Sequence, residues 1–151
     1  DENGSSVLPQ TAKLIGTCRS FEPDVQDRVQ QRLGEIAEGV ASAYGARAQC
    51  HYTRLYPALL NHEQQALAVK EIVRNWLGEE GLKPAPQQMT AEDFAFMTQV
   101  CPGCLFRLGI RDPKHTASLH ECEFDFNDEA TVYGSTLMVL IALNRLKAVN
   151  A

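Results

Sequence analysis

Apolar residues recur at steps of three and four over residues 25–44, with charged and amide side chains between them. This spacing predicts one amphipathic helix. Pro23 suits its first position, with Glu22 or Ser20 as the cap, and Gly45 suits its end. We interpret the apolar stripe as a core-packing face, formed by Val25, Val29, Leu33, Ile36, Val40 and Tyr44.

Two stretches on either side of this helix alternate with period two, which predicts half-buried strands. One runs from Thr11 to Cys18, after a short strand candidate at Val7-Leu8 that Pro9 breaks. The other runs from Ala46 to Tyr56, and His51 lies on its polar face, where we expect exposure.

The second half of the chain predicts helix, loop, helix, strand and helix. Asn61 would cap a helix over residues 62–77 that stops at Gly78, and two prolines make residues 81–86 a loop. A capping box at residues 90–93 opens a short helix ending near Val100, and residues 104–109 form an apolar strand. A long helix runs from Asn127 to about Leu146, with a core face of Val132, Thr136, Val139, Leu140, Leu143 and Leu146.

This order of elements predicts two parts that differ in pattern, with a boundary between Tyr52 and Asn61. The part before it reads as strand, strand, helix and strand, and the part after it as helix, loop, helix, strand and helix. A length of 151 residues with 44% hydrophobic content accommodates one domain or two small ones.

The net charge, the lack of long apolar runs and the cysteine content limit the partners and the cellular setting that we expect. The net charge is −5 and the 14 Lys and Arg are dispersed, so nucleic acid is an unfavoured partner. No apolar run reaches the roughly 18 residues of a membrane span. Five cysteines without framework spacing favour reduced thiols and a cytoplasmic setting, although a Cys101–Cys104 pairing stays open.

The densest candidate chemistry lies in residues 118–129. His120 precedes a run in which Phe124 and Phe126 alternate with acids, and Asn127 then begins the long helix as its N-cap. A loop histidine before a rigid element can be aimed at a metal or a substrate. A plain surface histidine explains the same spacing.

Two constellations compete for His120. Cys101, Cys104, His120 and Cys122 offer the thiolates and imidazole of a structural zinc site. Against it, residues 120 and 122 point to opposite faces of an extended segment, and Pro102-Gly103 explains a turn without metal. The other constellation joins His120 to Glu92 and Asp93, because metallohydrolases combine imidazoles with carboxylates. Helix capping is a sufficient alternative role for Asp93.

A family resemblance adds to this picture. The segment Gly16-Thr17-Cys18-Arg19-Ser20-Phe21-Glu22-Pro23 resembles the G-T-x-R-[ST]-F-x-P motif of the metal-dependent amidohydrolases that include hippurate hydrolases, auxin-conjugate hydrolases and N-acyl-amino-acid deacylases. Further segments match in the same order over nearly the whole chain, at residues 36–46, 56–61, 92–96, 102–109 and 119–129. Only the C-terminal portion of that family is matched, so the chain is expected to begin in mid-domain.

The resemblance implies a two-domain enzyme with a dinuclear divalent metal centre (Zn, Mn, Co or Ni) that hydrolyses N-acyl amino acids. Residues 1–55 would be part of a ferredoxin-like α+β lid or dimerisation domain, and residues 56–151 the C-terminal part of the α/β catalytic domain. His120 falls on the family's last metal ligand, whereas Glu92 and Asp93 fall on a turn expected to have a pocket or second-shell role.

The remaining ligands and the general-base glutamate belong to motifs absent from this sequence, so the chain alone is expected to lack a complete site. His51, His62 and His115 do not lie in such motifs, so they are not expected to replace the missing ligands. The expected substrate is an N-acyl amino acid or a small peptide-like molecule. The expected protein partner is a second copy, as a homodimer, or the missing N-terminal portion. A non-catalytic dimerisation module is the alternative function, and the zinc domain is another.

Overall fold

The computed structural model describes residues 8–149, with side chains described through residue 147. The chain divides into two compact units, Asp1–Ala58 and Leu59–Ala151. Val7, in the first strand candidate, lies outside the described residues. In these residues none of the helices combines the length and apolarity that a membrane span requires.

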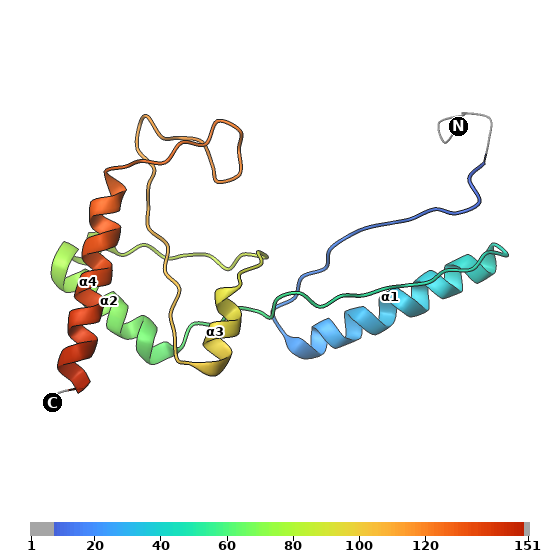
Figure 1. Ribbon diagram of the computed structural model, residues 1–151, viewed down its shortest axis with the longest axis horizontal. Helices are drawn as coiled ribbons and strands as arrows, with labels where there is room; N and C mark the ends of the chain where they lie inside the picture. Colours follow the sequence, from blue (N-terminus) through green and yellow to red (C-terminus); the bar gives the residue numbers. More distant parts are fainter. Residues whose placement is uncertain (1–7, 150–151) are drawn as a thin grey trace. The chain divides into compact units, whose positions relative to one another are not determined.

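The first unit is built on one long helix, α1 (Pro23–Ala43), which begins and ends where the sequence predicts (Figure 1). Pro23 occupies the first turn with its fixed φ. At the other end Gly45 adopts a φ of 71°, donates to Ser42 O, and Ala46 N donates to Ala41 O. This pair of bonds is a Schellman motif, in which only glycine adopts the left-handed residue without strain.

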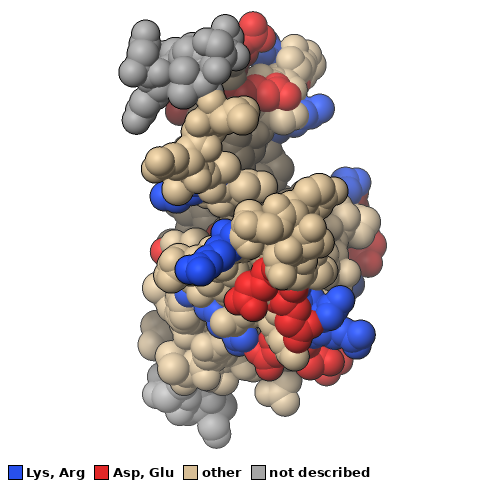
Figure 2. All heavy atoms as spheres, turned by 90° about the vertical axis from the view of Figure 1, so that its right-hand side faces the viewer, with Lys and Arg blue, Asp and Glu red and all other residues tan. Residues whose placement is uncertain are grey.

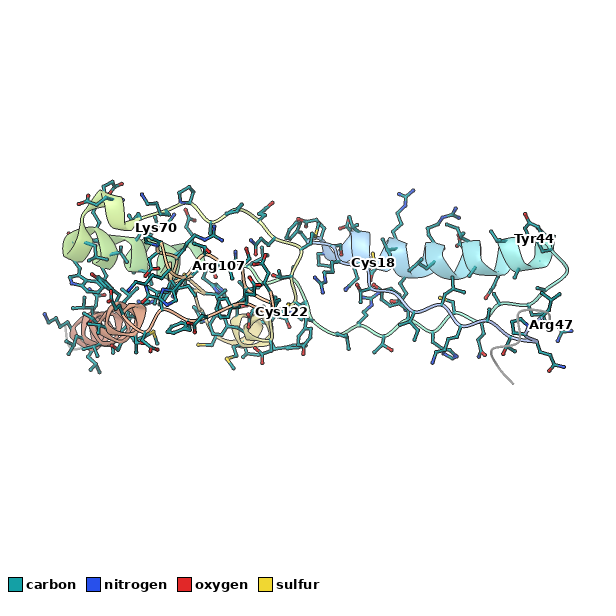
Figure 3. All side chains as sticks on the ribbon, turned by 90° about the horizontal axis from the view of Figure 1, so that it is seen from above. Cys18, Tyr44, Arg47, Lys70, Arg107 and Cys122 are labelled. Carbon is teal, nitrogen blue, oxygen red and sulfur yellow. The ribbon has the colours of Figure 1, made fainter. Side chains whose placement is uncertain are left out.

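The apolar stripe of α1 does not form a core, contrary to the prediction. No residue of α1 is buried, and Ile36 and Val40 keep about half of their surface exposed, 51% and 55%. Residues 8–20 and 46–58 follow α1 on one side without forming strands (Figures 1 and 3). Arg54 joins the second of these segments to α1, donating to Gln30 Oε1 at 2.7 Å and pairing with Asp27 at 2.6 Å.

The second unit contains α2 (Glu63–Leu77), a 3₁₀ turn η1 (Glu79–Gly81), α3 (Phe94–Val100) and α4 (Ala130–Val149). The helices over residues 62–77 and 94–100 are confirmed, and α2 stops at Gly78 as expected. The last helix is confirmed with a later start, at Ala130 instead of Asn127.

Helices α2 and α4 pack against each other and hold the small core of this unit. Val73 of α2 and Ala130 and Leu137 of α4 are buried, and the rings of Trp76 and Tyr133 lie 5.9 Å apart. Four residues of the predicted core face of α4 are instead at least half exposed: Val132, Val139, Leu143 and Leu146. Because α4 is apolar nearly all round, its periodicity does not define a single packing face.

Asn61 joins α2 to the segment 103–105 in place of capping the helix. Its side chain donates to Leu105 O and accepts from Leu105 N, both at 2.8 Å. His62 N donates to Gly103 O at 3.0 Å, and Gly103 N donates to His62 Nδ1 at 3.1 Å. A side chain and a ring nitrogen thus satisfy backbone groups that a neighbouring strand would satisfy in a sheet.

No β-strand occurs in residues 8–149, so the α/β prediction is confirmed only in its helices. The expected strands at 11–18, 46–56 and 104–109 have no ladder partner. The accessible surface is 13,120 Å², whereas even two separate compact units of half the mass would expose about 9,200 Å² by area–mass scaling. The lack of strand pairing is therefore accompanied by a much larger accessible surface than compact folding would leave.

Candidate functional site

His120 lies at the third position of a tight turn that the backbone closes. Glu121 N donates to Ser118 O at 3.1 Å, and His120 has a φ of 75°. In the described part of the chain it is the one non-glycine residue with a positive φ. A β-turn whose third residue has a positive φ, while its second does not, is of type II, and glycine or asparagine is favoured at that third position. A histidine here is a strained residue in an exposed loop, which is a recognised property of functional positions.

The turn is braced by its own flanking side chain. Ser118 N donates to Glu121 Oε2 at 2.7 Å, and Phe124 N donates to Glu121 O at 3.0 Å. Glu121 therefore satisfies backbone groups on both sides of His120 and leaves the imidazole exposed to solvent.

Asp112 ties the two ends of this loop together. Its Oδ1 accepts from Lys114 N at 2.7 Å, His115 N at 2.8 Å and His115 Nδ1 at 2.9 Å. Its Oδ2 accepts from Asn127 Nδ2 at 3.1 Å. Asn127 Oδ1 in turn accepts from Glu129 N at 3.0 Å, and this bond lies just ahead of α4, because the helix begins at Ala130 and not directly after Asn127 as predicted.

These hydrogen bonds also set the protonation of Asp112. The backbone N–H of His115, with smaller contributions from Lys114 and the His115 ring, holds the pKa of the carboxyl below its usual value against the opposing effect of burial. The charged form is the one that accepts all four bonds. On its other side, His115 Nε2 lies 4.0 Å from Asp125, whose side chain is 84% exposed.

A cavity of about 430 Å³ lies beside the turn. The two residues that precede His120 line it, together with Arg107, Arg111 and His115. Arg111 donates to Ser118 Oγ at 3.4 Å, which places a cation next to the turn. The wall therefore combines apolar side chains with a few polar groups, as ligand sites do.

Glu92 and Asp93 lie at the start of α3, where Glu92 has a local structural role. Phe94 N donates to Glu92 Oε1 at 3.2 Å, and no side-chain bond from Asp93 caps the helix. The predicted capping box beginning at Thr90 is therefore wrong in register, because the helix starts at Phe94. Glu92 is half-buried and Asp93 is exposed.

In residues 8–149 no three histidine, cysteine or acidic side chains come together in a group that could hold a metal ion. His120, Glu92 and Asp93 therefore do not assemble a centre, and the donor set of this chain by itself does not fit a bound metal. The zinc hypothesis fails for the same reason, since Cys101, Cys104, His120 and Cys122 are not grouped. All five cysteines are free thiols.

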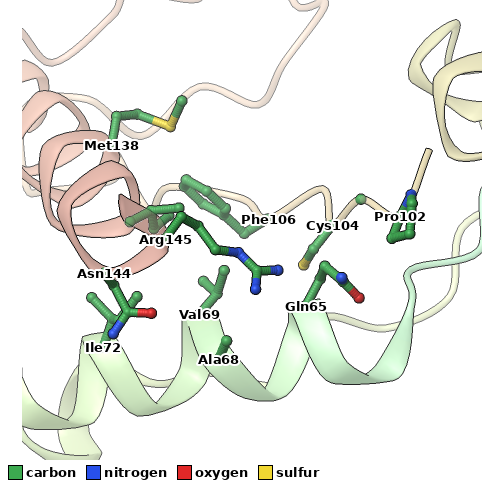
Figure 4. Close-up of a pocket in the computed structure, with 12 residues that line it drawn as sticks. Gln65, Ala68, Val69, Ile72, Pro102, Cys104, Phe106, Met138, Asn144 and Arg145 are labelled. Atoms are coloured by element: carbon green, nitrogen blue, oxygen red, sulfur yellow. The ribbon is translucent and has the colours of Figure 1, made fainter. Parts of the chain in front are cut away.

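Cys104 lines a different hollow, a groove of about 210 Å³ between α2, the segment 102–106 and α4 (Figure 4). Arg145 reaches from α4 across this groove above Val69. Burial raises the pKa of the Cys104 thiol, an effect that the charge of Lys70 partly opposes. A thiol with a raised pKa is a poor nucleophile and a poor metal ligand.

The network centred on Asp112 is the part of the site that sequence reasoning missed. Asp112-Pro113 is a turn-forming pair, because an aspartate side chain accepts from backbone groups two and three residues later. That signal predicts a local turn at residues 112–115. It contains no information about the bond to Asn127, fifteen residues away.

The amino-acid sequence of the chain also matches known proteins. Residues 7–144 match the family described as Peptidase family M20/M25/M40, and the chain belongs to this family. Its members are generally metal-dependent hydrolases. The resemblance inferred from the sequence motifs is thereby confirmed.

Three relatives illustrate the range of the family. The N-acetyldiaminopimelate deacetylases of Enterococcus faecalis and Anoxybacillus flavithermus are 29% and 30% identical over 85% and 83% of this chain. An IAA-amino acid hydrolase ILR1-like 2 from Arabidopsis thaliana is 28% identical over 96% of it. The matches cover 33%, 32% and 34% of those proteins, so the chain spans about a third of the length of the relatives it matches.

Proposed function

We propose that the chain is the C-terminal part of a metal-dependent amidohydrolase that removes an acyl group from an amino acid. The observation that carries the proposal is the family match over residues 7–144. It is supported by the names of relatives from bacteria and a plant, an N-acetyldiaminopimelate deacetylase and an IAA-amino acid hydrolase. Both names describe cleavage of the bond between an acyl group and an amino acid.

In this proposal His120 is the one metal ligand that the chain supplies. Its exposed position in a strained, braced turn supports the assignment. Glu92 and Asp93 would contribute to the pocket wall. The other ligands and the general-base glutamate would come from the remaining two-thirds of the protein, as would the strands that convert this unit into an α/β domain.

The test is a chimaera in which residues 8–147 replace the matching third of the Enterococcus faecalis deacetylase. Turnover of N-acetyl and N-benzoyl amino acids would be measured with Zn²⁺, Mn²⁺, Co²⁺ or Ni²⁺ added. We expect amide hydrolysis by the chimaera, none by the isolated 151-residue chain, and none by a chimaera carrying His120→Ala. A folded, monodisperse chimaera without turnover on any of these substrates would contradict the proposal, as would turnover by the isolated chain.

A partner is proposed for the first unit on separate grounds. Residues 8–18 and 46–55 are not part of any strand, and they accompany an apolar helix face that is half exposed. Backbone donors and acceptors of this kind are satisfied by adding a strand. We assign that strand to the N-terminal portion of the full-length protein, which would complete a ferredoxin-like lid, with a homodimer of completed lids as the next level of assembly.

The cysteines of the chain offer a direct test. Cys18 and Cys50 lie in the two extended segments, and Cys101 and Cys122 are exposed thiols of the second unit. Figure 3 labels Cys18 and Cys122. Adding the N-terminal two-thirds of the Enterococcus faecalis deacetylase should slow alkylation of Cys18 and Cys50 by at least tenfold and leave Cys122 unchanged. Protection that instead rises with the concentration of the chain alone would identify a second copy as the occupant.

The exposed stripe of α1 also favours the alternative function, a non-catalytic interaction module. That alternative predicts a complex that forms with the same protection of Cys18 and Cys50 but has no turnover with any metal. The thiol and turnover measurements together therefore separate the two functions.

A further inference from the structure

A loop of fourteen residues, 113–126, carries His120, and one carboxylate closes it. Asp112 stands before the loop and Asn127 after it, and their side chains meet at 3.1 Å. Between them the chain contains no helix or strand, so no secondary structure holds the loop in shape. The closing bond is also coupled to α4, because the same Asn127 side chain accepts from Glu129 N.

We propose that Asp112 is a positioning residue for His120, acting through Asn127 and His115 to hold the left-handed turn at residues 118–121 in place. This inference rests on the proposed function, in which His120 is a ligand, and adds a residue that the family motifs do not include. Asp112 touches no reacting atom. Its part is to fix the ends of the loop so that the strained turn persists in one conformation.

The geometry supports this role over a purely local one. A carboxylate that only formed its own turn would need the bonds to Lys114 N and His115 N and nothing more. Here the second oxygen is used as well, on a side chain that a helix start immobilises. Closing a flexible loop restricts its open conformations, so the turn within it loses less entropy when it forms.

Exchanging the two side chains provides a matched set of variants. Asp112→Asn keeps one oxygen for the local turn but turns an amide donor toward the donor of Asn127. Asn127→Asp keeps the acceptor for Glu129 N but turns a carboxylate toward Asp112. The double variant restores one donor and one acceptor in the reverse direction. Glu123→Gln is the control, a carboxylate-to-amide change in the same loop at an exposed position.

The experiment is hydrogen–deuterium exchange of the isolated chain at the amides of residues 118–124, with the backbone chemical shifts of His120 recorded in parallel. Each single variant should exchange about tenfold faster there, which corresponds to the loss of about one hydrogen bond, and the His120 shifts should move toward extended values. The double variant should return to within about twofold of the parent, and Glu123→Gln should not depart from it.

The inference is overturned if the single variants leave residues 118–124 unchanged, or if the double variant fails to recover. A single variant that loses the helicity of α2 and α4 does not end the test, because the double variant must then recover both helicity and protection. Exchange in the isolated chain needs neither metal nor substrate. Should the chimaera prove inactive while the exchange pattern holds, the proposed function fails and the positioning role stands.

An active chimaera adds a second readout. Asp112→Asn should lower kcat with little change in KM, and the double variant should restore it. A change confined to KM would contradict positioning of a ligand.

Discussion

At the scale of single residues, His120 combines an imidazole with a backbone conformation that suits glycine. The left-handed region costs a side-chain-bearing residue about 1 kcal/mol relative to glycine. The proposed role of its ring as a metal ligand would account for a histidine in such a turn.

A pair of variants separates the strain from the imidazole. His120→Gly and His120→Ala both remove the ring, but only alanine keeps the penalty. We expect the glycine variant to be more stable than the alanine variant by about 1 kcal/mol in urea unfolding of the second unit. Equal stabilities would mean that the turn relaxes when the ring is removed.

Asp112 gives the site a defined response to acid. Its folded pKa lies below its usual value of about 4, so its stabilising contribution is complete above pH 4 and is lost as the pH falls through the lowered folded value. The side-chain NH₂ resonances of Asn127 should therefore stay constant from pH 7 to about 4 and move only below it. Asp112→Asn should show no such transition, and a midpoint above pH 4 would contradict the geometry.

The sequence predicted His120 as the centre of the site because a histidine before an alternating run and a helix cap is a local pattern. It did not predict the bond between Asp112 and Asn127, nor the separation of His120 from Glu92 and Asp93. Both depend on how loops fold back in three dimensions, and no periodicity encodes that.

At the scale of elements, two hydrogen bonds between Asn61 and Leu105 join the start of α2 to the segment 103–105, as strand pairing would in a sheet. Asn61→Ala would leave a backbone donor and acceptor without their partner, and we expect the second unit to lose about 1 kcal/mol of stability in urea. Asn61→Asp is the control, since it keeps the acceptor for Leu105 N and loses only the donated bond. An alanine variant as stable as the parent would show that water replaces both bonds.

The helices were predicted well because their signals are local. Pro23, Gly45 and Gly78 mark ends that depend on backbone conformation alone. The strands were predicted from alternation at residues 11–18, 46–56 and 104–109, but alternation only becomes a strand when a partner supplies the ladder. The sequence did not show which face of α4 packs against the rest of the unit, because a helix that is apolar nearly all round presents several possible packing faces.

At the scale of the whole molecule, the two units differ in how much apolar surface they bury. Unit 2 has buried residues on α2, α3 and α4, whereas α1 has none. On the face seen in Figure 2, acidic and basic side chains adjoin one another instead of forming separate fields. Charge segregation therefore does not mark out a docking surface on that face, and the partner proposed for the first unit is argued from the exposed apolar stripe of α1 instead.

This difference predicts unequal protection within one chain. Amides in the middle of α1 should exchange at least tenfold faster than those around Val73 in α2, because opening α1 exposes little new surface. Adding the N-terminal portion should slow exchange in α1 selectively. Equal protection of α1 and α2 in the isolated chain would contradict the assignment of α1 as an unpartnered helix.

The junction of Asn61 with Leu105 has a consequence for sequence length. It closes a loop over residues 62–104, within which residues 82–91 are extended or coiled and largely exposed. Loop-closure entropy grows only with the logarithm of length, so ten residues inserted after Lys83 would cost about 0.2 kcal/mol. This stretch is thus the place where the chain can grow, or accept a reporter sequence, while α2 and the segment after Gly103 stay joined.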